Sequence, residues 1–358
     1  MNYDRPLWEH GSSFHFPDLD SFSNQRSSIG ISGTLVGSGR IALKTLLWFG
    51  HQNRGWQRIW IPSYYCEDVV DSLQDMPVHV SRYPAGPMGD DVIPDPVEGD
   101  VLLRVSYFGW GMNDLQRDFA GDIIEDHTHH PMGGLKSTAD FAFASLRKTL
   151  PLPDGGMLWS PRGHDVPVAT DMHPVHDEAV NKRLAAMLVK QAYFQGSDVD
   201  KETYRKLDLQ SEELMLQGNL SGISVWSRTM LERLPLNFWH KARLCNYVAF
   251  KGAISASDKV TIFGPKTVPS PTVALIQLPS RKIRDLLRQR LINEKIYTAV
   301  LWPGPTTDAP WYRAEDMEFS NTTLAIHVDA RYSEADMQKV AERIVALTSE
   351  LITSKQDI

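Results

Sequence analysis

Three short segments carry residues that could do chemistry, and they follow one another along the chain. The first is GSGRIAL, residues 37–43. A Gly-Ser-Gly turn that opens a helix presents free backbone N–H groups and the positive end of the helix dipole, which together favour a phosphate or another anion. The spacing is neither that of a Walker loop nor that of a GxGxxG fingerprint. Taken alone, the segment fits both an ordinary turn and a phosphate site.

The second segment is IIEDHTHH, residues 123–130, in which two acids end an apolar run and three histidines follow. It fits a solvated loop, a metal site of Asp126 with His127, His129 and His130, or a buried Asp126 that faces the ring of a cofactor with His129 nearby. The histidines lack the i, i+4 spacing of helical zinc ligands, so no metal ligands are predicted.

The third segment is FASLRKTLPLPDGGML, residues 143–158, where an apolar strand ends in Ser145 and a Pro/Gly-rich turn follows Lys148. A lysine just beyond a buried strand is usually a surface residue. Lys148 follows Asp126 by 148 − 126 = 22 residues, however, which is a βαβ-like spacing. Such a spacing can place both side chains at one pocket at the carboxyl ends of the strands.

Length and composition define the class of protein that carries these segments. A chain of 358 residues predicts two domains at roughly 150 residues each. The charge of 37 − 44 = −7 argues against nucleic-acid and membrane-surface partners. Two cysteines exclude a disulfide scaffold and favour the cytoplasm, and neither a transmembrane stretch nor a signal peptide is visible. These features predict a soluble cytoplasmic enzyme.

The elements that must position the three segments alternate between short apolar runs and helical patterns, which predicts an α/β fold with parallel strands. We expect strands at 57–62, 77–83, 100–108, 122–126, 140–145, 155–160, 272–278 and 322–328. We expect helices at 40–50 (ending at Gly50), 63–76 (capped by Ser63), 178–194, 224–254 (broken near Pro235), 280–296 and 333–352 (capped by Ser333 with Asp336).

The expected division is a large domain over residues 1–245, with an irregular arm over 1–30, and a small C-terminal α+β domain over 246–358. The boundary falls inside the long helical region at 224–254.

In this order the segments resemble the fold-type-I enzymes that use pyridoxal 5'-phosphate, and more narrowly the DegT/DnrJ/EryC1/StrS family of aminotransferases, many of which act on nucleotide-linked ketosugars. The resemblance covers most of residues 30–350. The matching stretches are SGRIAL (38–43), IPSYYC (61–66), YFG (107–109), DIIEDHTHH (122–130), ASLRKTLPLPDGG (144–156) and LAIHVDARYSEADMQKVAERI (324–344). It implies an α/β, aspartate-aminotransferase-like three-layer sandwich with a mostly parallel central sheet, plus a small C-terminal α+β domain.

On this resemblance Lys148 would be the lysine that forms a Schiff base with the cofactor aldehyde and then shuttles a proton. Asp126 would pair with the pyridinium nitrogen and keep the ring an electron sink. His129 matches a position near the ring hydroxyl. Lys148 and Asp126 are therefore the expected catalytic residues.

The resemblance also assigns the phosphate and the ring face. Ser38, Gly39 and Ser145 would hold the phosphate, and Arg40 would either add charge or lie on the helix surface. The family often places its phosphate-binding serine five residues before the lysine, whereas Ser145 is three before.

Tyr64 or Tyr65 would stack on the ring. The usual aromatic of the family falls at Cys66 in this chain, so the choice between the two tyrosines stays open.

Four functions follow, ranked in this order. The first is an aminotransferase that moves an amino group from a glutamate-like donor to a ketone acceptor, a nucleotide-linked ketosugar being one option. The second is another reaction of the same cofactor, by a lyase or decarboxylase. The third is a metal-dependent hydrolase, and the fourth is a non-catalytic regulatory relative.

The family also implies a homodimer with shared active sites. The partner's contribution would come from the loop at 217–219, which otherwise is a plain connection between helices. The Pro-rich stretch 303–311 after Trp302 would border the acceptor pocket or be an ordinary loop. His173 and His176 are expected at the surface.

Overall fold

The computed structural model describes residues 8–19, 30, 32–89, 91–112, 119–255, 257–305 and 309–353. These residues build a seven-stranded sheet in the order β1-β7-β6-β5-β4-β2-β3. Its strands are β1 (Thr34–Val36), β2 (Arg58–Pro62), β3 (His79–Tyr83), β4 (Asp100–Val105), β5 (Asp122–Asp126), β6 (Phe141–Ser145) and β7 (Gly156–Trp159). Neighbours from β3 to β6 are parallel, as predicted.

The β7 edge is the antiparallel part of this mostly parallel sheet, since β7 runs antiparallel to both β6 and β1. The chain between β6 and β7 is too short for the crossover that a parallel pair requires. It contains only the 3₁₀ turn η4 (Leu146–Lys148) and the Pro/Gly-rich turn.

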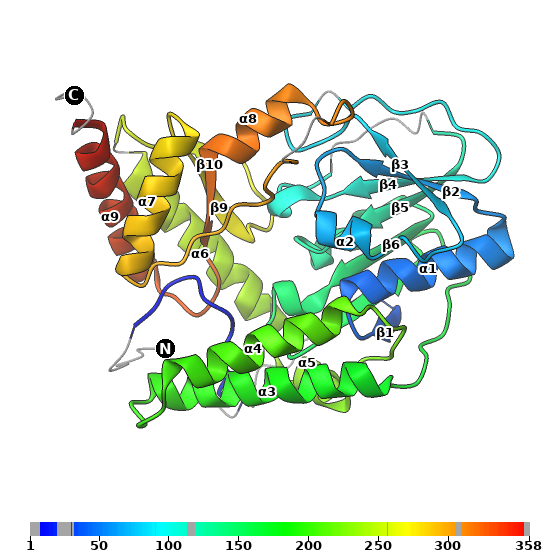
Figure 1. Ribbon diagram of the computed structural model, residues 1–358, viewed down its shortest axis with the longest axis horizontal. Helices are drawn as coiled ribbons and strands as arrows, with labels where there is room; N and C mark the ends of the chain where they lie inside the picture. The colour runs from blue at the N-terminus through cyan, green and yellow to red at the C-terminus, as the bar shows by residue number, and fades with distance from the viewer. Residues whose placement is uncertain are drawn as a thin grey trace.

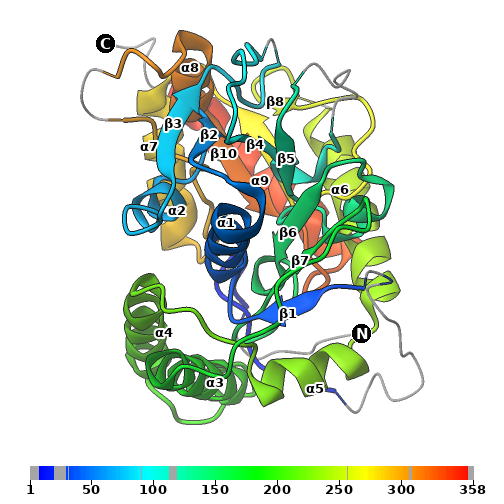
Figure 2. The same cartoon turned by 90° about the vertical axis from the view of Figure 1, so that its right-hand side faces the viewer.

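Helices cover both faces of the sheet (Figure 2). One face packs on α1 (Gly39–Arg54), with α2 (Glu67–Asp71) beside it. The other face, near β6 and β7, is covered by α5 (Val225–Arg233), the start of α6 (Leu236–Ile254) and the arm over residues 8–19. A pair of contacting helices, α3 (Pro174–Phe194) and α4 (Lys201–Leu216), lies along one edge of the molecule (Figure 1).

The small C-terminal domain packs α6, α7 (Arg281–Asn293) and α9 (Glu334–Thr353) with a three-stranded antiparallel sheet in the order β10-β9-β8. Its strands are β8 (Thr261–Phe263), β9 (Val273–Gln277) and β10 (Thr323–His327). Ser333 and Asp336 cap α9 reciprocally, as predicted: the Asp336 N–H donates to Ser333 Oγ at 3.2 Å, and the Ser333 N–H donates to Asp336 Oδ2 at 3.0 Å.

The bounds of several predicted helices are wrong, and for two of these helices the structure shows the reason. The helix that was expected to stop at Gly50 continues to Arg54, because Gly50 is the contact point of Trp56: a Cβ there would lie 1.8 Å from the indole ring. The helix expected over 63–76 shrinks to α2, since the Ser63 hydroxyl donates to the Ala85 carbonyl at 2.9 Å instead of capping a helix.

The sequence prediction also missed four elements, namely β1, α4, β8 and α8 (Ala314–Thr322).

The proposed domain boundary at 245/246 falls inside α6, whose first half packs with the large sheet and whose second half packs with the small domain. This boundary stays a prediction, and residues 1–7 and 20–29 of the predicted arm lie outside the described part of the chain. None of the helices in the described ranges has the length and apolar character needed to span a membrane.

Candidate active site

The carboxyl end of β5 places Asp126 at the centre of a hydrogen-bonded group on the α1 face of the sheet. Asp126 is 6% exposed. The Tyr65 hydroxyl donates to Asp126 Oδ2 at 2.6 Å, and the Thr128 N–H donates to Oδ1 at 2.8 Å. Burial, reinforced by the Asp126 charge, raises the pKa of Tyr65 well above its usual value, so Tyr65 stays a donor. A carboxylate with two such donors can still accept another.

Glu125 on β5 and His127 just after it point to the opposite face from Asp126, because side chains alternate along an extended chain. His127 Nε2 and Glu125 Oε2 lie 2.9 Å apart, and the Ser137 hydroxyl donates to the same oxygen at 2.6 Å. The histidine cluster is therefore divided between two faces of the sheet. Within the described ranges, no group of three or more His, Cys, Asp or Glu side chains is arranged to hold a metal ion.

Of the three histidines at 127, 129 and 130, only His129 lines the cavity that Lys148 enters. Its ring contacts the rings of Phe108 and Trp302, whose centroids are 5.6 and 5.9 Å away and which also contact each other. Burial lowers the pKa of His129 to about 4, so the ring is neutral near pH 7. Because Nδ1 accepts the Phe108 N–H at 3.1 Å, the proton of the neutral ring lies on Nε2, which can donate.

Lys148 follows β6 and is tied to Asp126 through the backbone. The Ser145 N–H donates to Thr128 Oγ1 at 3.1 Å, and Thr128 itself bonds Asp126. The positive charge of Arg147 and, second, burial lower the pKa of Lys148 to about 8. The lysine side chain opens into a cavity, which leaves it accessible although protein surrounds the amine.

The start of α1 lies directly against the end of β6. The Ser38 hydroxyl accepts the Ile41 N–H at 3.2 Å, which makes Ser38 the N-cap of α1. A Cβ on Gly39 would lie 2.8 Å from the Ser145 Cβ, so glycine permits this close approach. The arrangement brings Ser38, Gly39 and Ser145 together, as an anion site would require.

Arginines surround this helix start. Arg40 Nη1 is buried without a hydrogen-bond partner, and burial followed by the charge of Arg147 lowers the pKa of Arg40. Arg147 donates to both carboxylate oxygens of Glu212, at 2.9 and 3.1 Å, and Arg183 pairs with the same carboxylate. Glu212 pairs with Arg147 and shares Arg183 with Asp208, whereas Arg40 has no carboxylate partner among the described residues and is available for an anion.

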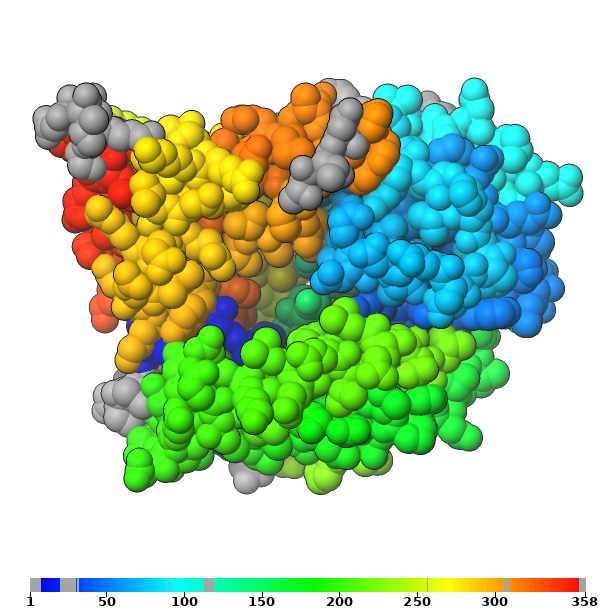
Figure 3. Space-filling view, viewed as in Figure 1, coloured from blue at the N-terminus to red at the C-terminus, as the bar shows by residue number. Residues whose placement is uncertain are grey.

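A cavity of about 340 Å³ lies between the two domains, and Arg147, Arg183 and Glu212 line it, whereas Asp126, Arg40 and the start of α1 do not. Its walls come from His129 and Lys148 of the large domain, Arg243 of α6, and residues 299, 301, 327 and 329 of the small domain. Residues 11–14 of the arm form a further wall. In the space-filling view this region is a hollow between the small domain, the α1–α2 region and the α3–α4 pair (Figure 3).

The two tyrosines lie in different environments. Tyr65 holds Asp126, whereas the ring of Tyr64 packs edge-on against Tyr107 and Phe319, with centroids 5.8 and 5.5 Å away. Which of them stacks on a cofactor ring stays a prediction.

Sequence reasoning missed Thr128, Glu212 and Arg243. Arg243 had a signal: it lies on the stripe of buried residues Trp239, Arg243, Asn246 and Phe250, where a charge is unusual. His176, expected at the surface, is buried, with its Nε2 3.0 Å from Asp154 Oδ2, while His173 caps α3.

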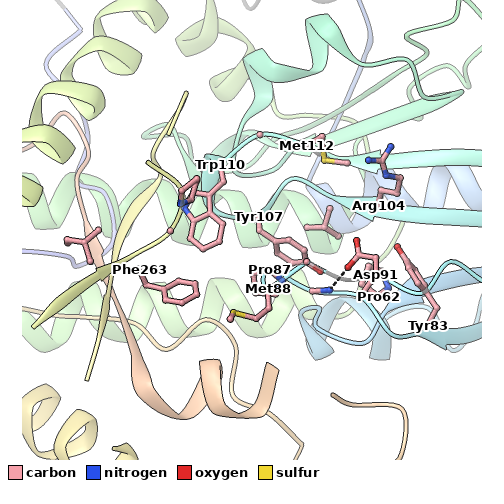
Figure 4. Close-up of a pocket in the computed structure, with 18 residues that line it drawn as sticks. Pro62, Tyr83, Pro87, Met88, Asp91, Arg104, Tyr107, Trp110, Met112 and Phe263 are labelled. Atoms are coloured by element: carbon pink, nitrogen blue, oxygen red, sulfur yellow. Dashed lines mark hydrogen bonds between the residues drawn. The ribbon is translucent and has the colours of Figure 1, made fainter. Parts of the chain in front are cut away.

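A second cavity, of about 480 Å³, lies beyond the carboxyl ends of β2, β3 and β4, against β8 (Figure 4). Tyr107, Trp110 and Phe263 form its apolar side, and Arg104 and Asp91 its polar side. Burial raises the pKa of Asp91. None of the predicted site residues lines this cavity.

Solved structures share the fold over nearly the whole chain. A Streptococcus pneumoniae protein described as a sugar aminotransferase, in its PLP form, superposes with a TM-score of 0.59 at 13% identity, covering 96% of this chain and 93% of that one. The aminotransferase TlmJ of Streptoalloteichus hindustanus gives 0.58 at 14% identity, covering 95% and 93%. DesI, solved in the presence of its TDP-sugar product, gives 0.56 at 12%, covering 98% and 89%.

At 12–14% identity this likeness shows the fold alone, and it confirms the predicted aspartate-aminotransferase-like fold. No family model matches the sequence, and no curated protein matches it.

Proposed function

We propose that the protein is a pyridoxal-phosphate-dependent aminotransferase that moves an amino group from a glutamate-like amino acid to a ketone. The observation that carries the proposal is the buried, unpartnered Nη1 of Arg40 at the start of α1, next to the group that joins Asp126 to the Lys148 segment. A buried polar group without a partner is destabilising, and an anion that pairs with it removes that penalty.

The residues present fit the phosphate of this cofactor. The start of α1 offers backbone N–H groups and the positive end of the helix dipole, and Arg40 adds a guanidinium with no carboxylate partner among the described residues. The close contact of Gly39 with Ser145 brings a serine to the same place. Two helix-start residues, one arginine and one serine would therefore hold the phosphate.

The residues also fit the ring. When bound, the cofactor supplies an electron sink for bond breaking at the carbon that carries the amine. Asp126 keeps acceptor capacity for a protonated ring nitrogen, and Tyr65 and Thr128 fix the orientation of its carboxylate. His129 holds a proton on Nε2 and can donate it to an oxygen on the ring.

Lys148 is suited to accept and return protons. With a pKa of about 8, part of its amine population is neutral near pH 7, and only the neutral amine is a nucleophile or a base. The positive charge of Arg147 keeps the pKa of Lys148 low and so favours the neutral amine. The expected roles of Lys148 in binding the cofactor carbonyl and in moving the proton at the substrate carbon both depend on it.

The acceptor to test first is a nucleotide-linked ketosugar, because DesI was solved in the presence of its TDP-sugar product. A homodimer with a partner loop at 217–219 and a cytoplasmic location remain predictions, as does a border of the acceptor site at 303–311, of which 306–308 lie outside the described residues.

The test is an absorbance titration with pyridoxal phosphate on the wild type, Lys148→Ala and the control Lys339→Ala, whose residue is exposed on α9. We expect a near-visible band that borohydride abolishes in the wild type and the control, and no such band in Lys148→Ala. Amino acids that bleach the band should release the matching 2-oxo acid. Release of carbon dioxide or ammonia instead would favour a decarboxylase or lyase, and no band in any protein would refute the proposal.

A further inference from the structure

A buried pair of an aspartate and a histidine lies against the turn that opens α1. Asp154 precedes β7 and is fully buried, and His176, near the start of α3, is 4% exposed. His176 Nε2 lies 3.0 Å from Asp154 Oδ2. A carboxylate only accepts hydrogen bonds, so Nε2 carries a proton and donates it. The proposed chemistry at Lys148 and Asp126 uses neither residue.

The start of α5 holds Asp154 in place. The Ser224 hydroxyl donates to Oδ1 at 2.6 Å, the Ser224 N–H donates to Oδ2 at 2.9 Å, and the Ser227 hydroxyl also donates to Oδ1. Together with the bond from His176, the carboxylate accepts four hydrogen bonds from two helices. These partners offset the cost of burying the carboxylate and leave the imidazole one orientation.

The imidazole of His176 packs against Gly37, the residue before the N-cap of α1. A Cβ on Gly37 would lie 2.4 Å from Nε2 and 2.6 Å from Cε1 of this ring, and its three nearest atoms would all belong to the ring. Gly37 does not have a positive φ. The ring, and not an unusual backbone conformation, is therefore what requires glycine at this position.

Two hydrogen bonds tie Gly37 to the neighbours of the pair. The Gly37 N–H donates to the Ser221 carbonyl at 2.9 Å, and the Gly37 carbonyl accepts the Gly155 N–H at 2.7 Å. The Gly155 carbonyl accepts the Leu146 N–H at 3.0 Å, at the start of the turn that carries Lys148. The segment with the buried aspartate therefore joins the turn before α1 to the turn with the lysine.

We propose that Asp154 and His176 are positioning residues of the phosphate end, which hold the turn over residues 37–39 for the anion. The first N–H groups of a helix have no acceptor within the helix, so the turn before it sets their direction. The imidazole, anchored by Asp154, fixes where Gly37 lies and so aims these N–H groups at one anion beside Arg40. The proposal rests on the proposed function for the identity of this anion.

A comparison of pyridoxal phosphate with pyridoxal, which has no phosphate, separates positioning from folding. In His176→Ala the Kd of pyridoxal phosphate should rise about 10-fold, whereas the Kd of pyridoxal should not change. The control is His164→Ala, whose ring lies 3.2 Å from the buried Asp140 at the amino end of β6, and which should change neither value. Absorbance titration gives each Kd. Equal losses for both ligands in His176→Ala, or no loss, would overturn the proposal.

A double-mutant cycle tests whether the ring acts through Gly37. Gly37→Ala places a methyl group where the ring lies, so it should weaken pyridoxal phosphate binding about 10-fold in the wild-type background. In the His176→Ala background the same methyl group meets no ring and should cost less than about 2-fold. Additive losses would contradict the proposal. His176→Gln keeps a donor for Asp154, so it should give an intermediate loss, and it carries the test if His176→Ala does not fold.

Inorganic phosphate tests the same residues without the cofactor. Calorimetry should show weaker phosphate binding in His176→Ala than in the wild type and in His164→Ala. If the wild type forms no cofactor band, the proposed function fails, while the phosphate result still decides the role of the pair. Equal phosphate affinity in the three proteins, or no phosphate binding in any of them, would then overturn the positioning role.

Discussion

The two positively charged ends of the site are built differently. At the α1 end the guanidinium of Arg40 stands beside backbone N–H groups and a serine pair. At the α6 end Nη1 of Arg243 is buried without a partner, in a cavity that both charged residues and the apolar Leu152, Val273 and Leu301 line. Donors that converge from backbone and side chains suit a tetrahedral phosphate that stays bound.

The two ends also differ in what supports them. The α1 end rests on the large sheet, since Ser145 and Thr128 belong to β6 and to the loop after β5. The α6 end is assembled across domains: Asn246 of α6 donates to the carbonyls of Asp329 and Tyr332 at 2.9 Å each, and Arg331 holds the arm. The α6 end should therefore be the more sensitive of the two to loss of tertiary contacts.

The largest expected effect is at the α6 end. Asp329→Asn removes the buried acid that pairs with Arg331, and breaking a buried ion pair costs about 3–5 kcal/mol of unfolding free energy. The matched control is Glu294→Gln, whose ion pair with Arg343 is half-exposed and contributes about 0–1 kcal/mol. Urea unfolding of both variants measures the difference. Equal losses would mean that the α6 end does not depend on Asp329.

Arg40→Gln tests the α1 end. The variant loses the unpaired guanidinium, so pyridoxal phosphate should bind about 10- to 100-fold more weakly. Arg243→Gln, at the other end, should leave this affinity unchanged. Titration of the cofactor band gives both values. The comparison between the ends breaks down if Arg40→Gln and Arg243→Gln weaken cofactor binding alike.

The sequence predicted the α1 end better than the α6 end, and the reason is physical. A Gly-Ser-Gly turn before a helix and an acid at a strand end are local patterns, so Ser38, Gly39 and Asp126 could be found within short segments. Whether the guanidinium of Arg243 is free depends on residues that are distant in the sequence. It is free because Asp329, 86 residues later (329 − 243), is held by Arg331, and no local pattern shows that.

The same distinction explains the errors in the fold. Gly50 is a plausible helix stop on local grounds, but the ring of Trp56 requires the glycine inside α1. Glu212, which sets the charge at the α1 end, lies on α4, a helix that the sequence did not predict. Long-range contacts therefore decided both the helix length and the charge balance.

The third prediction concerns the charges around Lys148 and is smaller. Arg147 is the largest cause of the lowered pKa of Lys148, about 8, whereas Glu212 acts to raise it. Arg147→Gln should therefore raise this pKa and leave less neutral amine near pH 7, and Glu212→Gln should lower it. The pH dependence of the rate at which the cofactor band appears should shift upward in the first variant and downward in the second. Shifts in the same direction would contradict this account.

The smallest expected effect separates capping from cofactor binding. Ser38 caps α1 and Ser280 caps α7 in the same way, accepting the Ile41 and Ile283 N–H groups at 3.2 and 3.4 Å. Either Ser→Ala change should cost about 1 kcal/mol of unfolding free energy through the lost cap. Only Ser38→Ala should also weaken pyridoxal phosphate binding, since α7 lies in the small domain away from the phosphate end. Equal cofactor affinity in the two variants would mean that Ser38 only caps the helix. The phosphate would then be bound by Arg40 and the backbone N–H groups.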